Sequence, residues 1–416
     1  MSPMPNALNI PIVPDVCEGA PSHPGKDAAK RTTTKEEHHF PPEQDVCEAT
    51  GGNLTAVLTG FKTFVLEDRP VPVPKGDEIL VRVMATGICG TDLNFYLAKG
   101  MRPLSKPHVL GHESCGVVLD VGPQVRNIKR GEHVAIEPAL PCRVCRYCKQ
   151  GQWNYCVHDG YMATPPTDGT MSRLFVCSEH NAVPLPEGIS WEESGCIQPL
   201  AVAVQIARRA GALAHQSVAV VGCGPLGLLT LALARAHGAR TLVAIDINAS
   251  RVEFVKKYIP TAKTFVMPTH APTPSPNAAS AEQLQAHCMS FAQSVVREVG
   301  AAHAHGLDVV VEASGAESAI VTGMHLLRHG GTYVQAGLGR PLTLFPTFAL
   351  ADKELTIRGS LRYTAGCFED AIHLVESGAV DLKMLVTRTV PMSHVEEAFD
   401  AFARGDEIKV VIMNQE

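Results

Sequence analysis

Residues 217–234 read SVAVVGCGPLGLLTLALA and form the longest uncharged stretch of the chain. Its length raises the question of a membrane-spanning helix, which needs about 20 apolar residues. Three glycines and Pro225 interrupt the stretch, and both residue types commonly form turns that separate helices and strands. The stretch therefore predicts a buried strand, a tight turn and a helix that ends at Gly238, and not a membrane span.

The glycines of this turn have the spacing GxGxxG and directly follow the predicted strand. Glycine permits a tight turn and a close approach of the backbone to a ligand, and the N-terminus of the following helix attracts a pyrophosphate. In this context the pattern is typical of dinucleotide binding. The predicted cofactor-binding residues of the turn are Gly222, Gly224, Pro225, Leu226 and Gly227.

An acid, Asp246, ends the next predicted strand, where it could accept hydrogen bonds from the ribose diol of an adenosine. A carboxylate there would repel a 2'-phosphate, so NAD is favoured over NADP. Arg251 follows shortly afterwards, weakens that preference and completes the predicted cofactor site. The alternative role of Asp246 is a helix N-cap, which its position permits but which leaves the glycines unexplained.

The segments around this turn alternate between strand and helix patterns, which predicts an α/β fold with a parallel sheet covered on both faces. Segment 268–283 interrupts the alternation and is predicted to be a surface loop insertion. Earlier segments are short and punctuated by glycine and proline, which predicts a mostly β domain. The predicted organisation is a disordered tail over 1–52, the β domain over 53–198, the nucleotide-binding domain over 199–343, and a return to the β domain over 344–416, where LTIRGSLRY and IKVVIM would add strands.

The chain has 416 residues, a formal net charge of -6 and a pI near 6.3. This charge gives no electrostatic footprint for nucleic acid or for an anionic membrane, so small-molecule partners are expected. The N-terminal segment lacks the apolar core of a signal peptide and is too acidic for a mitochondrial presequence, which predicts a cytoplasmic protein. In that compartment the 13 cysteines are expected to be thiols and metal ligands and not disulfides.

Four cysteines are grouped in the segment CRVCRYCKQGQWNYC, at Cys142, Cys145, Cys148 and Cys156. This spacing lets four thiolates reach the corners of one tetrahedron. Because no corner remains for a substrate, the segment predicts a structural zinc site. The alternative is a group of free or disulfide-linked cysteines.

A second candidate metal site combines GICGTD, residues 87–92, with GHE, residues 111–113. Taken singly, Cys89 and His112 are more often packed or hydrogen-bonded interior residues, and Glu113 is more often a solvated or paired acid. Glycines flank the cysteine and precede the histidine, and a dinucleotide enzyme needs a place where an alcohol or carbonyl is activated. These features favour a catalytic zinc with an open position.

The motifs GICGTD, GHESCG, VGPQV, ATPPTDG and VVGCGPLG, with the four cysteines, resemble the zinc-containing medium-chain dehydrogenases. More narrowly, they look like the branch that oxidises sorbitol, xylitol or L-arabinitol with NAD and zinc to give a ketose. The resemblance covers roughly residues 53–416. It implies a GroES-like catalytic domain built from both ends of that segment, a Rossmann domain between them, an active site in the cleft, and dimers or tetramers.

Residue by residue, the resemblance assigns catalytic-zinc ligands to Cys89, His112 and Glu113. Thr91 matches the hydroxyl that passes the alcohol proton onward, and Asp92 matches a position behind the ligands. The segment GSLRY resembles the substrate-proximal Arg-Tyr pair of the family, which is Arg362 and Tyr363 in this chain.

The chain departs from the polyol branch at two places. Gln198 stands where an acid usually approaches the metal, and Asn94 and Phe95 stand where a His-Tyr pair is frequent. These departures leave open a dehydrogenase of another secondary alcohol, of the threonine or butanediol type. Gln198 also leaves open a non-catalytic nucleotide-binding relative. The preferred alcohol distinguishes the two enzyme hypotheses, whereas two zinc ions per chain without activity on any alcohol would favour the non-catalytic relative.

Overall fold

The computed structural model describes residues 52–415 except 100–103, 105, 159, 270–277 and 302–304. The predicted N-terminal tail lies outside the described residues, apart from Gly52, and so does most of the predicted loop insertion. No helix in the described part of the chain is long and apolar enough to cross a membrane. The stretch that raised this question forms β11 (Ser217–Val221), a turn and α6 (Pro225–Ala236).

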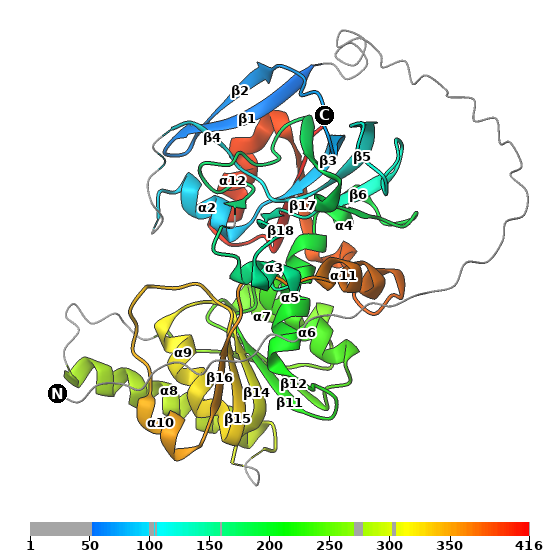
Figure 1. The fold of residues 1–416 in the computed structure, drawn as a ribbon. Helices are drawn as coiled ribbons and strands as arrows, with labels where there is room; N and C mark the ends of the chain where they lie inside the picture. The colour runs from blue at the N-terminus through cyan, green and yellow to red at the C-terminus, as the bar shows by residue number, and fades with distance from the viewer. Residues whose placement is uncertain are drawn as a thin grey trace, which may run out of the picture. The chain divides into compact units, whose positions relative to one another are not determined.

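A six-stranded parallel sheet forms one region of the molecule and confirms the predicted α/β class (Figure 1). The strand order is β13-β12-β11-β14-β15-β16, and every neighbouring pair is parallel. The other strands of this sheet are β12 (Thr241–Asp246), β13 (Lys263–Val266), β14 (Leu307–Glu312), β15 (Leu327–Gln335) and β16 (Thr356–Gly359).

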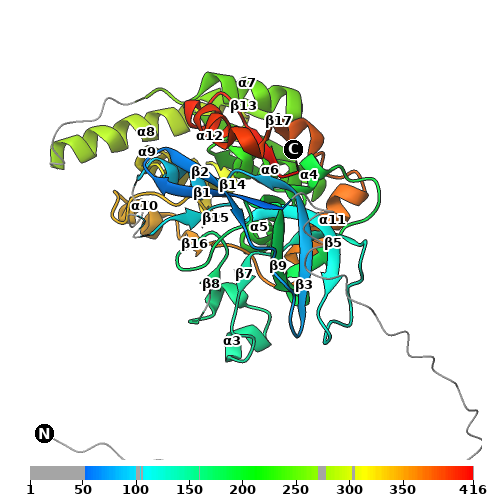
Figure 2. The ribbon, with the colours of Figure 1, turned by 90° about the horizontal axis from the view of Figure 1, so that it is seen from above.

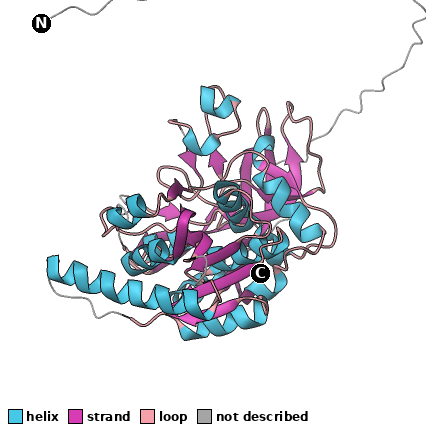
Figure 3. Cartoon of the chain, turned by 90° about the horizontal axis from the view of Figure 1, so that it is seen from below, coloured by secondary structure: helices cyan, strands magenta, loops and turns pink. Residues whose placement is uncertain are grey.

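Helices cover both faces of the parallel sheet, as the alternation of segments predicts (Figure 3). Within β11, Val218 and Val220 belong to one apolar cluster together with α5 and α6, whereas Ala219 and Val221 belong to another with α8 and α9. Alternate residues of a strand point to opposite faces, so each face of β11 buries its own helix layer. The bounds of these helices are α5 (Ile197–Ala210), α7 (Ala249–Tyr258), α8 (Ala278–Glu298), α9 (Glu317–Leu326) and α10 (Thr347–Asp352).

Two sequence expectations about this region are wrong. LTIRG was expected to return to the β domain, but β16 pairs in parallel with β15 and forms the edge of the parallel sheet. Residues 278–283 were assigned to a loop insertion, but they form the first part of α8. In both cases the local sequence pattern does not predict which part of the structure the segment packs against.

The β region contains a seven-stranded sheet in which most pairs are antiparallel. Its order is β10-β6-β5-β3-β18-β17, with β9 also paired to β3. Figure 2 shows β9, β3 and β5 of this sheet next to one another. IKVVIM was expected to add a strand here, and it does, because β18 pairs antiparallel with β3. The strands are β3 (Glu78–Gly87), β5 (Glu113–Val121), β6 (His133–Ile136), β9 (Leu174–Ser178), β10 (Ala182–Pro184), β17 (Val386–Pro391) and β18 (Lys409–Met413).

Two small sheets and several short helices complete the described structure. The small sheets have the orders β2-β1-β4 and β7-β8. Their strands are β1 (Asn53–Gly60), β2 (Thr63–Arg69), β4 (His108–Val109), β7 (Ala139–Leu140) and β8 (Gly160–Tyr161). The remaining helices are α2 (Gly90–Tyr96), α3 (Arg146–Lys149), α4 (Trp191–Ser194), α11 (Cys367–Glu376) and α12 (Val395–Arg404), with 3-10 turns η1 (Trp153–Tyr155), η2 (Glu179–Asn181), η4 (Lys383–Leu385) and η5 (Met392–His394).

Candidate active site

The glycine turn between β11 and α6 has the backbone that its sequence predicts. Gly222 has a φ of 102°, in the region that favours glycine, and Gly224 is the N-cap of α6 with Pro225 in its first turn. A Cβ on Gly227 would lie 1.8 Å from the carbonyl oxygen of Gly222, so only glycine fits there. The turn therefore packs tightly and places the N-terminus of α6 directly after β11, where a pyrophosphate could bind.

Asp246 is buried at the end of β12 and is tied to the glycine turn. Its carboxylate accepts hydrogen bonds from the N–H of Cys223 at 2.6 Å and from the N–H of Asn248 at 2.8 Å. The N-cap of α7 is Asn248, whose side chain accepts from the N–H groups of Ser250 and Arg251. The N-cap alternative for Asp246 is therefore wrong, and Arg251 lies in the first turn of α7, half-buried.

The four cysteines of the lobe, residues 142–156, gather in space as their spacing predicts. Their sulfur atoms all lie within 4.8 Å of one another. The Sγ atoms of Cys145 and Cys148 are 3.5 Å apart, and the N–H groups of Cys142 and Cys145 point to the Sγ atoms of Cys156 and Cys142, each at 3.4 Å. None of the four forms a disulfide.

The protonation of the lobe cysteines is also compatible with a bound cation. The backbone N–H groups of Val144 and Cys145 lower the pKa of Cys142 to about 6, whereas burial raises the pKa of Cys148 to about 12. Without a cation the lobe would therefore hold thiolate and thiol together. Four sulfur donors with no position left for a substrate match a structural zinc.

The second cluster forms where β3 ends and β5 begins. The antiparallel register pairs Gly87 with Glu113, so the residues just beyond each strand end meet. As a result one donor atom each of Cys89, His112 and Glu113 lies within 4.8 Å of the others. A thiolate, an imidazole and a carboxylate are a donor set that suits zinc and leaves a fourth position for another ligand.

Asp92 lies behind this cluster, in the first turn of α2, and is fully buried. Its carboxylate accepts from the N–H groups of Cys89 at 3.1 Å and Gly111 at 3.3 Å, and lies 3.4 Å from Nδ1 of His112. Burial alone would raise the pKa of Asp92, but His112 and these N–H groups outweigh it and lower that pKa. Asp92 can thus orient the imidazole as a carboxylate partner does in many metal sites. Thr91 is half-buried beside it in α2.

Sequence reasoning missed Lys409, the first residue of β18. Its ammonium group is 1% exposed and pairs with Oε2 of Glu113, and it also donates to the carbonyl oxygen of Ile88 at 3.0 Å. Gly87 leaves room for this pair, because a Cβ there would lie 2.7 Å from Oε2 of Glu113. The available signal was a lone lysine in an apolar strand, since a buried charge requires a partner.

Tyr161 joins the remaining predicted residues to the second cluster. Its ring lies edge-on to that of His112, with centroids 5.6 Å apart, and the Arg362 guanidinium lies 4.1 Å from the Tyr161 ring centroid. Gln198 donates from Nε2 to the Tyr161 hydroxyl at 2.9 Å. Tyr363 is buried, and its hydroxyl accepts from the N–H of Ala139 at 3.0 Å. The motif ATPPTDG lies just after Tyr161, but the sequence did not single out this tyrosine.

The two residues that depart from the family pattern in α2 lie differently. Phe95 is buried in the apolar cluster formed with β1 and α12, 6.5 Å from the ring of His108, whereas Asn94 is exposed. Phe95 thus contributes to the core of the β region.

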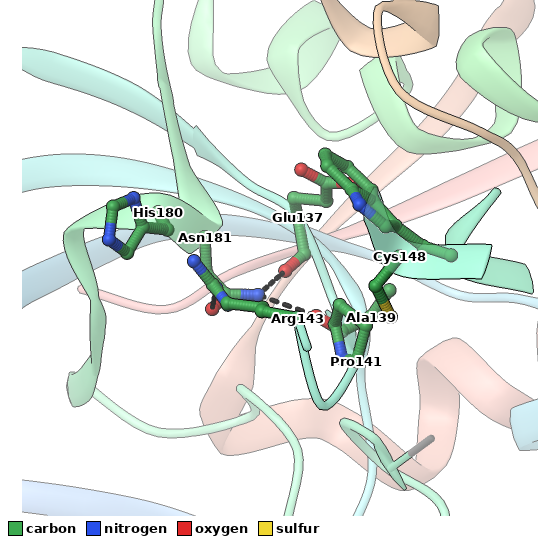
Figure 4. A pocket seen from close by; sticks show the side chains of 8 residues that line it. Glu137, Ala139, Pro141, Arg143, Cys148, His180 and Asn181 are labelled. Atoms are coloured by element: carbon green, nitrogen blue, oxygen red, sulfur yellow. Dashed lines mark hydrogen bonds between the residues drawn. The ribbon is translucent and has the colours of Figure 1, made fainter. Parts of the chain in front are cut away.

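A cavity of about 290 Å³ lies beside the cysteine lobe and is separate from the second cluster (Figure 4). Asn181 spans one side by donating from Nδ2 to the carbonyl oxygens of Glu137 and Ala139, each at 2.7 Å. Burial and the charge of Glu369 raise the pKa of Glu137 to about 8, although Arg143 opposes this. The lining residues are Glu137, Ala139, Pro141, Arg143, Cys148, Trp153, His180 and Asn181.

Comparison with known proteins agrees with this geometry. Residues 75–187 match the alcohol dehydrogenase GroES-like domain, and residues 225–377 match the zinc-binding dehydrogenase domain. D-xylulose reductase A of Aspergillus oryzae is 42% identical over 366 residues, which cover 87% of this chain and 97% of that protein. D-xylulose reductase A of Aspergillus niger is 42% identical over 363 residues, or 86% and 96% of the two chains. The crystal structure of L-idonate 5-dehydrogenase from Escherichia coli has a TM-score of 0.73 at 27% identity and covers 87% of this chain and 98% of its own.

Proposed function

We infer that this chain, which belongs to the zinc-binding alcohol dehydrogenase family, is a zinc- and NAD-dependent polyol dehydrogenase that oxidises a secondary alcohol to a ketose. Within the xylitol, sorbitol and L-arabinitol class, we propose xylitol as the preferred substrate. The relatives that are 42% identical are named D-xylulose reductases, and reduction of a ketopentose gives a pentitol. The observation that carries the proposal is the meeting of Cys89, His112 and Glu113, with Tyr161 against His112.

The residues of this cluster have separate roles in the proposed reaction. When bound, zinc supplies a Lewis acid that polarises the substrate hydroxyl, and NAD accepts the hydride. Cys89, His112 and Glu113 would hold the metal, and Cys142, Cys145, Cys148 and Cys156 would hold a structural zinc. Asp92 orients the His112 imidazole through its carboxylate. Thr91 would carry the alcohol proton away from the substrate.

Glu113 is proposed as the third, negatively charged ligand, because Gln198 is neutral and its amide donates to Tyr161. Lys409 orients the Glu113 carboxylate, since its ammonium group contacts Oε2. If Glu113→Gln bound zinc and turned over at the wild-type rate, this ligand assignment would be wrong.

The cofactor site is proposed to favour NAD. The glycine turn would hold the pyrophosphate, and the Asp246 carboxylate, buried at the end of β12, would accept hydrogen bonds from the ribose diol. Arg251, which follows this strand in the first turn of α7, keeps the preference from being absolute.

The deciding experiment is initial-rate formation of reduced nicotinamide by zinc-replete protein. NAD and NADP are each tested with xylitol, sorbitol, L-arabinitol, threonine and 2,3-butanediol. We expect a clear preference for NAD and a polyol, with xylitol first. Turnover of threonine or butanediol without turnover of any polyol would reject the substrate class and leave a smaller secondary alcohol.

We further propose that residues 53–198 and 344–416 act as the catalytic domain and residues 199–343 as the nucleotide-binding domain, except that β16 extends the parallel sheet. We also propose that the protein is cytoplasmic and forms a homodimer or homotetramer. Sedimentation velocity of the purified protein tests the assembly state.

A further inference from the structure

Tyr161 occupies a position that the proposed reaction does not yet use. It is 8% exposed and belongs to β8, which pairs with β7 so that Tyr161 lies opposite Ala139. Its ring contacts His112 on one side and Arg362 on another. A substrate that reaches the Cys89, His112 and Glu113 cluster therefore approaches a phenol.

The hydroxyls of Tyr161 and Tyr363 each accept a hydrogen bond from a neighbouring N–H group. The N–H of Ala139 donates to the Tyr363 hydroxyl at 3.0 Å. Gln198 donates to the Tyr161 oxygen from Nε2. This bond uses the oxygen of Tyr161 as an acceptor and leaves its O–H available to donate to another oxygen.

The Tyr161 side chain is buried beside the Cys89, His112 and Glu113 cluster. A buried hydroxyl that does not donate is unfavourable, so a ligand oxygen at this point would be favoured.

We propose that Tyr161 is a specificity-determining residue whose hydroxyl donates to a polyol hydroxyl adjacent to the carbon that is oxidised, and that Gln198 is the positioning residue that directs this proton toward the substrate. The inference rests on the proposed polyol dehydrogenase function and deepens it. It also gives the departure at Gln198 a physical role. A carboxylate at position 198 could only accept hydrogen bonds. The Tyr161 O–H would then donate to that carboxylate and would no longer be available to the substrate.

Selectivity between two alcohols tests the proposal. Xylitol has hydroxyls next to the reacting carbon, whereas 2-butanol has none. In Tyr161→Phe we expect the KM for xylitol to rise roughly 10-fold while kcat/KM for 2-butanol stays within about 2-fold of wild type, as loss of one hydrogen bond to substrate implies. Xylitol binding to the NADH complex, measured by calorimetry, should weaken by the same factor.

Gln198→Glu should shift selectivity in the same direction without removing the phenol, because it reverses the hydrogen bond to Tyr161. Tyr258→Phe is the matched control, since this buried phenol donates to the carbonyl oxygen of Asp381 and lies outside the site. Tyr258→Phe should leave the ratio of kcat/KM for xylitol to kcat/KM for 2-butanol unchanged. Zinc per chain and melting temperature are measured for each variant to show that the metal and the fold are intact.

The outcomes separate this inference from the proposed function. If wild type oxidises xylitol but Tyr161→Phe with full zinc leaves the ratio unchanged, Tyr161 does not contact the substrate and the inference is overturned. An equal loss with both alcohols assigns Tyr161 to packing of His112 and also overturns it. Should Tyr161→Phe lose zinc, an unchanged ratio in zinc-replete Gln198→Glu rejects the proposal, and a lower xylitol preference supports it. If wild type oxidises 2-butanol and no polyol, the proposed function itself fails.

Discussion

The two metal-type clusters of this chain have donors at similar separations but are assembled in opposite ways. All four sulfur donors of the lobe come from one short segment of the chain, residues 142–156. The second cluster takes Cys89 from the end of β3 and His112 and Glu113 from the start of β5, and Lys409 from β18 holds its carboxylate. Lys409 and Glu113 are 296 positions apart.

This difference in assembly matches a difference in chemistry. Four thiolates from a short loop close a tetrahedron and can only stabilise structure. Three donors at the ends of strands leave a fourth ligand position open and can be oriented by partners such as Asp92 and Lys409. We therefore expect substitutions in the lobe to act on stability and zinc retention, and substitutions in the second cluster to act on turnover.

The largest effect is expected from Cys145→Ser in the lobe. Loss of one of four thiolates should weaken zinc binding there by on the order of 5 kcal/mol, and the lobe should lose local order because metal binding and folding are coupled. Zinc per chain, measured by mass spectrometry after mild chelation, should fall from two to one. Cys177→Ala, a buried cysteine outside both clusters, is the control and should keep two. Two zinc ions in Cys145→Ser would contradict the assignment.

Cys89→Ser should have the next largest effect, and on activity. We expect kcat/KM for the preferred alcohol to fall at least roughly 1000-fold, about 4 kcal/mol, because the Lewis acid is lost or misplaced. The lobe zinc should remain, so one zinc per chain is expected together with a nearly unchanged melting temperature. Near wild-type kcat/KM would remove Cys89 from the catalytic site.

Glu137→Gln tests whether the Glu137 carboxylate, which lines the cavity beside the lobe, destabilises the folded chain when it ionises. The pKa of Glu137 is raised from 4.5 to about 8 in the folded chain, so the unfolded chain gains stability by ionising this acid as the pH rises above about 4.5. Stability present at lower pH is therefore lost between about pH 4.5 and 8, and the variant should avoid this loss.

At pH 8 the variant should be more stable than wild type by roughly 4 kcal/mol, and at pH 4.5 the two should be nearly alike. Urea unfolding at both pH values measures the difference. A constant difference between the two pH values would show that Glu137 does not titrate in this window.

Asp92→Asn is expected to have the smallest of these effects. It keeps the shape of the side chain but removes the charge that orients His112, so zinc affinity at the second cluster or kcat should fall about 10- to 100-fold. Competition with a zinc chelator and steady-state rates measure the two quantities. Lobe zinc serves as the internal control, because Asp92 does not contact it.

Local sequence was sufficient for much of the fold and of the candidate site. The glycine turn, the helix N-terminus at Pro225 and the alternation of strands and helices depend on residues close together in the chain, so their spacing predicts them. The cysteine lobe is equally local. The trio of Cys89, His112 and Glu113 was reached through its motifs and through the resemblance, and its members lie together in space.

The sequence by itself thus determined the α/β class, the dinucleotide turn and the donor residues, because these depend on local periodicity, spacing and side-chain chemistry. Only the tertiary structure decided that β16 joins the parallel sheet, that Lys409 pairs with Glu113, and that Gln198 and Arg362 both contact Tyr161. These contacts join strands and helices from distant parts of the chain. They follow from sheet register and packing, which no local pattern specifies.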